Sequence, residues 1–150
     1  MPFSTGSIND PQAIGGGERL GVSNIILTAL DFEDGLKVGR FAKLDAGSLD
    51  NMDGSGTPTI AGVVMRNVAN PVEDGAVIDA DLFEQVEFMR KGMTTVDVKA
   101  GETPAMFGAV YASNAGDADD GLAVTSAGID VKAEFIAEIQ PGVWSILFTS

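Results

Sequence analysis

The sequence contains no histidine and no cysteine, and these two absences exclude most common catalytic chemistries. Without histidine there is no imidazole general base, no Ser-His-Asp triad and no histidine metal ligand. Without cysteine there is no thiolate nucleophile, no cysteine zinc site and no disulfide. Enzyme chemistry would have to use carboxylates, lysine, or an oxygen-bound Mg²⁺ or Ca²⁺ ion. We therefore predict a protein that is not an enzyme and that uses no cofactor.

Basic residues are also scarce. Nine Lys and Arg residues stand against 22 Asp and Glu residues in a chain of 150, which gives a net charge of −13. Nucleic acids and anionic membranes bind through clusters of Lys and Arg, so this balance predicts neither as a partner. The hydrophobic fraction of 45% distinguishes the chain from acidic disordered tails. The sequence thus predicts a folded protein with an acidic surface, whose partner is a protein or a cation.

Long apolar runs are missing as well. No stretch approaches the roughly 18 apolar residues of a membrane span, and the first ten residues, MPFSTGSIND, lack the basic region and apolar stretch of a signal peptide. We expect a protein that stays in the cytosol where it is made, or in a particle that assembles there.

Residues 1–21 differ in composition from the rest of the chain. They are rich in Gly, Ser, Asn and Pro, and they include three consecutive glycines at 15–17. Such a segment is either an extended arm that docks on a partner or a frayed terminus without a role. Its isolated apolar residues favour the docking arm, and they are the predicted contacts: Phe3, Ile8, Ile14 and Leu20. Residues 22–150 are long enough for one domain with a single core.

Within this domain, apolar residues recur mainly with a period of two, in short segments bounded by Gly, Pro, Asp and Asn. We predict seven to nine short strands and at most one short helix, in a small antiparallel β-barrel or sandwich of the jelly-roll or tulip-like kind. A turn is expected at Pro141-Gly142. The expected strands are 25–29, 36–44 with a bulge at Gly39, 60–68, 84–90, 96–98, 106–112, 129–135 and 143–148.

Two segments are harder to assign. Residues 45–58 are predicted to be an acidic, Gly-rich loop. Residues 79–90 have apolar residues at helical spacing, but Phe88 would project away from that stripe, whereas a strand places Val86 and Phe88 on one side. We favour a strand for 84–90 and keep a helix as the alternative.

Few residues suggest a binding site. Asp117, Asp119 and Asp120 in the segment NAGDADDG resemble a calcium loop, but their spacing is not that of an EF-hand. We predict a solvated acidic loop, with a weak divalent-cation site as the alternative. Arg90 and Lys91 are predicted to be exposed. Trp144 lies in a core-like strand, so we expect it to pack in the core rather than to bind a sugar.

Residues 86–113, VEFMRKGMTTVDVKAGETPAMFGAVYAS, resemble the centre of the phage structural cement family of capsid decoration proteins. The shared features are an Arg-Lys-Gly step at 90–92, a short strand at 96–98, an Ala-Gly-Glu turn at 100–102 and a Val-Tyr ending at 110–111. A Gly- and Asp-rich loop at 114–121, a strand near 129–139 and a final hairpin extend the resemblance to about residues 60–150.

The resemblance implies a virion protein on the outer surface of the phage head, made in the host cytoplasm. Its partners would be the major capsid protein and further copies of itself, as a homotrimer or, less favoured, a homodimer at the symmetry axes. There it would stabilise the head against the pressure of packaged DNA. A protein on the outer face needs no DNA contact and tolerates a charge of −13. The alternative is a β-sandwich module that binds a ligand or receptor on a virion or bacterial surface.

Overall fold

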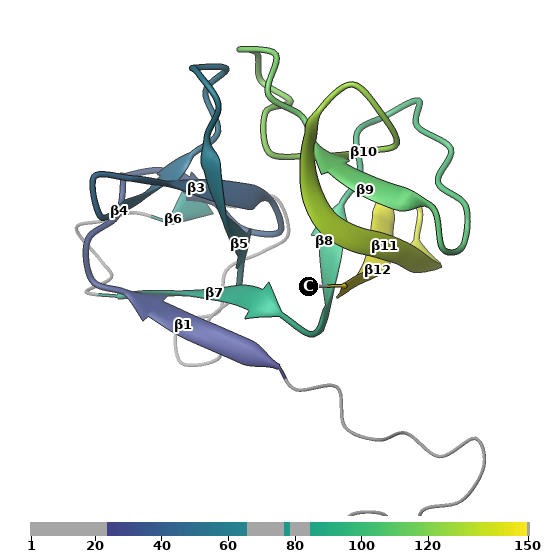
Figure 1. Ribbon diagram of the computed structural model, residues 1–150, viewed down its shortest axis with the longest axis horizontal. Coiled ribbons are helices and arrows are strands. Elements are labelled where there is room, and N and C mark those ends of the chain that lie inside the picture. Colours follow the sequence, from purple (N-terminus) through teal and green to yellow (C-terminus); the bar gives the residue numbers. More distant parts are fainter. Residues whose placement is uncertain (1–23, 66–76, 79–84, 150) are drawn as a thin grey trace, which may run out of the picture.

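The computed structural model describes residues 24–65, 77–78 and 85–149, and within these ranges the protein is all-β, with twelve strands and no helix. Two five-stranded sheets and one two-stranded sheet form the molecule, and every pair of neighbouring strands is antiparallel (Figure 1). The predicted all-β class is confirmed. Of the two architectures predicted, barrel or sandwich, the barrel is wrong, because the sheets do not close. The two large sheets are open and pack face to face, as in a β-sandwich.

The first large sheet has the strand order β1-β7-β5-β3-β4, which places β1 and β4 at its edges. Its strands are β1 (Ile25–Ala29), β3 (Phe41–Asp45), β4 (Ser48–Asn51), β5 (Thr59–Val64) and β7 (Val86–Lys91). The two-stranded sheet pairs β2 (Leu36–Lys37) with β6 (Val77–Ile78).

The second large sheet has the order β10-β9-β11-β12-β8. Its strands are β8 (Met93–Asp97), β9 (Ala109–Ala112), β10 (Ala123–Val124), β11 (Ile129–Gln140) and β12 (Val143–Phe148). The alternation predicted at 129–135 is confirmed, because Val131 and Phe135 are buried while Lys132 is exposed. The Pro141-Gly142 turn is confirmed too, with Gly142 at φ 81°.

Two apolar cores hold the sheets together. One lies between the two large sheets, where Phe41 and Val63 from the first meet Val110, Phe135 and Ile146 from the second. The other is formed by the first large sheet and the two-stranded sheet, and contains Leu36, Leu49, Val64, Ile78 and Phe88 among others. The strands β3 and β5 are therefore buried on both faces, since residues of each contribute to both cores.

The chain passes from the first large sheet to the second through one residue. Gly92 separates β7 from β8 and adopts φ 108°, a conformation that side chains rarely allow. A Cβ at this position would also lie 2.9 Å from the Cα of Asn24, just before β1. The Asn24 side chain accepts a hydrogen bond from the Met93 N–H at 3.3 Å. Further links join the sheets, including the bond from the Phe41 N–H to the Gly121 carbonyl at 2.9 Å.

Several predicted boundaries change. The predicted loop 45–58 contains β4, because Ala46 and Gly47 both have positive φ and form a tight hairpin turn with β3. The predicted strand 36–44 is divided into β2 and β3, with Gly39 in the turn between them rather than in a bulge. Residues 106–107 form a turn, so that β9 begins only at Ala109.

The preference for a strand over a helix is confirmed from Val86 onward, since β7 buries Val86 and Phe88 on the same side, and residues 79–84 lie outside the described ranges. The predicted strand 60–68 is observed as β5 up to Val64, and its last residues fall outside the described ranges. The arm predicted at 1–21 also lies outside the described residues.

Candidate functional site

The first candidate contact surface lies on β1, at an open edge of the first large sheet (Figure 1). Ile25, Ile26 and Leu27 are 39, 46 and 42% exposed, and Leu30, just after the strand, is 77% exposed. We call these four residues the β1 surface. Successive residues of a strand point to opposite faces, so apolar side chains are exposed on both faces of β1.

This edge differs from the other three edges of the large sheets. Edge strands are usually protected by charged residues or by being short. β4 and β8 include Asp50 and Asp97, and β10 has two residues. In contrast, residues 20–30 contain no charged side chain at all. The β1 surface is thus the edge best suited to contact another protein.

The second candidate surface is a turn before β9, where two large apolar side chains project. Met106 is 61% exposed and Phe107 is 66% exposed. We call this pair the 106–107 tip. It belongs to an uncharged stretch that runs from Thr103 to Gly116.

The backbone of this turn is strained and firmly held. Phe107 has φ 67°, a left-handed conformation that is a genuine outlier for a bulky residue. Its N–H donates to the Phe135 carbonyl at 2.7 Å, the Phe135 N–H donates to the Gly108 carbonyl at 2.9 Å, and the Gly108 N–H donates to the Ala105 carbonyl at 2.9 Å. Phe135 itself is fully buried, so the tip is fixed to the core of the second large sheet.

A hollow of about 380 Å³ adjoins the segment that leads to this tip. Residues 98–104 form one wall, and Gly142 and Trp144 contribute to the other. The Trp144 ring packs edge-on against Phe135 with centroids 5.7 Å apart, which confirms the predicted packing role. We call this feature the Trp144 hollow.

Glu102, on the wall of the Trp144 hollow, is held by hydrogen bonds to the second large sheet. Its carboxylate accepts bonds from the Thr125 N–H at 2.6 Å and from the Thr125 hydroxyl at 2.8 Å. The backbone bond, and then the hydroxyl bond, lower the pKa of Glu102 below its usual value of 4.5. The carboxylate is therefore a structural part of the wall.

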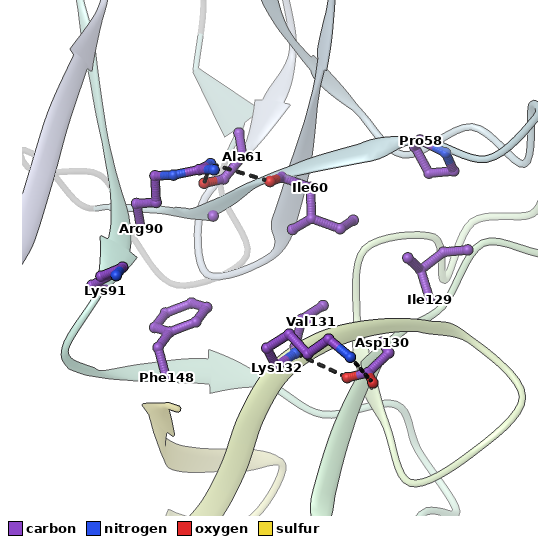
Figure 2. Close-up of a pocket in the computed structure, with 11 residues that line it drawn as sticks. Pro58, Ile60, Ala61, Arg90, Lys91, Ile129, Asp130, Val131, Lys132 and Phe148 are labelled. Atoms are coloured by element: carbon purple, nitrogen blue, oxygen red, sulfur yellow. Dashed lines mark hydrogen bonds and ion pairs between the residues drawn. The ribbon is translucent and has the colours of Figure 1, made fainter. Parts of the chain in front are cut away.

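A cleft of about 360 Å³ separates β5 and β7 from β11 and β12, and Figure 2 shows three cationic side chains around it. These are Arg90, Lys91 and Lys132, from a chain with only nine basic residues. Arg90 donates to the carbonyls of Ile60 and Ala61 at 3.4 and 3.3 Å, and Lys132 pairs with Asp130 at 3.0 Å (Figure 2). Arg90 and Lys91 are exposed, as predicted. Arg90 and Lys132 already have hydrogen-bond or ion-pair partners among the residues of the cleft.

The acidic loop 114–121 is organised by its own hydrogen bonds. Asp120 accepts bonds from the Gly116 N–H at 3.0 and 3.1 Å and is only 4% exposed, so the prediction of a solvated loop is wrong for this residue. Asp117 accepts from the Asp119 N–H at 2.9 Å, and Asp119 lies 4.0 Å from the Lys99 ammonium. In the described part of the chain, no three acidic side chains gather as a metal site would require.

A buried lysine stabilises the neighbouring loop. Lys43 is 6% exposed, and its ammonium lies 2.8 Å from the Asp53 carboxylate and 3.1 Å from the Ser55 hydroxyl. The hydrogen bond to Asp53 raises the pKa of Lys43 and, together with bonds from Ser55, holds the pKa of Asp53 far below its usual value. This pair is a structural feature that stays charged at neutral pH.

The predicted contacts Phe3, Ile8, Ile14 and Leu20 all lie outside the described residues. Sequence reasoning missed both the β1 surface and the 106–107 tip. A usable indication for β1 is the uncharged stretch 20–30, in which consecutive apolar residues break the period-two alternation. For the tip, Pro104 before and Gly108 after the pair indicate a turn at Met106 and Phe107.

No helix in the described residues has the length and apolar character needed to cross a membrane.

Comparisons with known proteins give two matches. A family model described as "Structural cement protein (E217 gp24/Pam3 gp6)" matches residues 5–144. A chain in the structure "The capsid of Myoviridae Phage XM1" is similar with a TM-score of 0.77 and 30% identity, over 85% of this chain and 84% of that chain. No curated protein sequence matches. The family match reaches well before residue 60, where the resemblance in the sequence begins.

Proposed function

Because this chain belongs to the family of phage structural cement proteins, we propose that it decorates the exterior of an assembled phage head and stabilises it against the pressure of packaged DNA. Family membership and the likeness to a phage capsid chain make it a structural protein of the virion. Binding to the outer surface, at the symmetry axes and as a homotrimer, is the more specific part of the proposal.

The observation that supports the proposal best is the uncharged, apolar edge at β1. A strand edge offers unpaired backbone groups to a partner, and apolar side chains on both of its faces would be covered by the same contact. We propose that the arm 1–21, with Phe3, Ile8, Ile14 and Leu20, and the β1 surface together contact the major capsid protein. The arm leads directly into β1, so one contact would include both.

The charge of the chain supports placement on the outside of the particle. A net charge of −13 repels packaged DNA but favours solubility for a protein present in many copies. An oligomer with several arms would also gain retention on the head through effective concentration, even if each arm binds weakly.

Co-sedimentation with undecorated heads tests this function. Deletion of residues 1–17, and separately a variant with Phe3, Ile8 and Ile14 all changed to Ser, should each reduce the bound fraction by about tenfold or more, because every 1.4 kcal/mol of lost binding is a factor of ten. Unchanged binding of both variants would exclude the arm as the contact.

The β1 surface is tested with a matched pair of substitutions. Leu27→Asn should weaken binding to heads, whereas Leu44→Asn on β3, at a similar 40% exposure, should not. Equal effects of the two substitutions would remove β1 from the contact. Failure of the unmodified chain to bind heads at all would favour the alternative, a module that binds a ligand or receptor.

A further inference from the structure

We infer that the 106–107 tip is the contact between copies of this chain, and that Met106 and Phe107 of one copy enter the Trp144 hollow of the next. The inference deepens the proposed function, since it rests on the oligomer proposed there and identifies the surface that forms it. It concerns a part of the molecule that the arm and the β1 surface do not include.

The tip contributes little to the stability of the isolated chain, and its backbone strain lowers it. Two large apolar side chains are more than 60% exposed, and one of them is held in a left-handed backbone conformation. Such strained residues persist where the surrounding structure enforces them, and they cluster at sites of function. Within the described residues Phe107 stays 66% exposed, so its side chain is available to a partner.

The tip is also prepared for binding. Backbone bonds fix Phe107 and Gly108 to Phe135, which is fully buried, and the turn is closed by the bond from Gly108 to Ala105. A side chain presented on a fixed backbone loses little conformational entropy on association. Exposed aromatic residues on rigid supports are typical of residues that dominate binding energy.

The segment before the tip lines a pocket that could receive the tip of another copy. Residues 98–104 line the Trp144 hollow, and the tip follows two residues later. Pro104 and Trp144 provide apolar surface, and Lys99, Glu102 and Glu138 provide a charged rim. The indole suits an aromatic partner, because aromatic pairs are more favourable than their buried area alone. The volume of about 380 Å³ is in the range of small binding sites.

A second copy fits this surface better than the capsid protein does. Each copy has both the projecting tip and the hollow, and closed symmetric oligomers require that both halves of a contact be present on every subunit. Residues 103–116 are uncharged, so the tip itself adds no repulsion between two chains of charge −13, and the hollow has Lys99 beside its two carboxylates, Glu102 and Glu138. The segment between β8 and β9 also lies at the opposite side of the molecule from β1, so this contact would leave the proposed capsid contact free (Figure 1).

The first test changes the tip without changing the fold. Phe107→Gly removes the ring and also relieves the strained φ, and Met106→Gln keeps the backbone as it is. Light scattering at micromolar concentrations should give the mass of a dimer or trimer for the unmodified chain and a mass near 15.5 kDa for both variants. Leu30→Gln on the β1 surface is the control. The Leu30 side chain is 77% exposed, more than either tip residue, but this variant should keep the oligomeric mass.

Thermal unfolding of dilute, dissociated protein adds a second readout. There, Phe107→Gly should melt a few degrees higher than the unmodified chain, since relief of about 1 kcal/mol of strain raises Tm by roughly 2–4 °C at this size. An oligomeric mass retained by both tip variants, or a monomeric mass for the unmodified chain, would overturn the inference.

The second test addresses the hollow. The chain has no cysteine, so single cysteines can be introduced without background. Met106→Cys and Pro104→Cys copies, mixed and oxidised, should form a disulfide between two different copies. A disulfide in the Met106→Cys sample alone would mean that tips contact each other, and absence of any disulfide would remove the hollow from the contact.

These outcomes are separate from those of the proposed function. Tip variants that are monomeric but still bind heads, more weakly, would support both proposals. An unmodified chain that forms oligomers and does not bind heads would leave the contact between copies standing and overturn the decoration function.

Discussion

The β1 surface and the 106–107 tip are both uncharged and apolar, but the backbone holds them in different ways. β1 is a strand paired with β7 over all five of its residues, with one shift of register between Ile25 and Ile26. The tip is a turn with a left-handed phenylalanine, fixed by hydrogen bonds to a buried residue. An exposed strand edge is extended by further backbone pairing, whereas a rigid tip is suited to fill a pocket.

The difference shows which exposed apolar residues give information about function. Single apolar residues on a surface are common and need no explanation. The β1 surface is informative because it lies at an edge without protection by charge. The tip is informative because a large apolar side chain is both exposed and held in a strained backbone conformation at Phe107. We propose a different partner for each surface, the capsid for β1 and another copy for the tip.

The largest expected effect comes from the residue beneath the tip. Phe135→Ala should lower the free energy of unfolding by about 3–5 kcal/mol, because it empties the core of the second large sheet and removes the ring that packs against Trp144. Urea unfolding measures the loss, and amide hydrogen exchange should show greater opening at 105–108 than in β1. A similar increase in both places would mean that the two surfaces are not independent.

A smaller effect is expected where β1 meets the junction of the sheets. Gly92→Ala should destabilise the fold by about 1–3 kcal/mol, since alanine strains a φ of 108° and its Cβ would approach Asn24. Gly101→Ala is the matched control, because Gly101 also has positive φ, 89°, but no atom lies within 4 Å of the added Cβ. Equal losses for the two variants would show that Asn24 is not a constraint.

The smallest effect concerns pH and the wall of the Trp144 hollow. Glu102→Gln should cost about 1 kcal/mol at neutral pH, through weaker hydrogen bonds to Thr125. In the unfolded state Glu102 takes up a proton near pH 4.5, whereas in the folded state it stays ionised to a lower pH. The stability that Glu102 contributes is therefore fully present above about pH 4.5 and is lost as the pH falls through the lowered pKa of the folded state.

Unfolding at a series of pH values from about 7 to about 3 tests this prediction. The difference between the unmodified chain and Glu102→Gln should shrink as the pH falls. Glu134→Gln on β11 removes the same charge and serves as the control. A difference that stays constant with pH would contradict the assigned hydrogen bonds.

The strands that could be predicted are those whose pattern depends on one buried face. Val131, Ala133 and Phe135 alternate with polar neighbours, and the strand they predict is present. β4 could not be predicted in this way, since Leu49 is its only apolar residue and the strand depends on the turn at Ala46-Gly47. The barrel was a wrong prediction because periodicity defines strands but not how sheets close.

The contact surfaces were harder to predict than the strands. Met106 and Phe107 have the composition of a strand, and their exposure depends on how Phe135 holds the turn. Asp120 has the composition of a solvated loop, yet it is buried with its carboxylate on the Gly116 N–H. The tip is held by Phe135, and the Asp120 carbonyl accepts a bond from Arg40, 80 residues away; such distant contacts are not recorded by a local pattern.

The single-residue junction at Gly92 has a mechanical consequence. In the β1-β7 pair, Ile25 lies opposite Lys91, so a pull on the segment before β1 and a restraint on β8 would act at the same end of two antiparallel strands. Force applied there would open the hydrogen bonds one after another, rather than load them all in shear. The bond between Asn24 and Met93 lies at that end and would bear the load first, so the lifetime of the protein under tension depends on it.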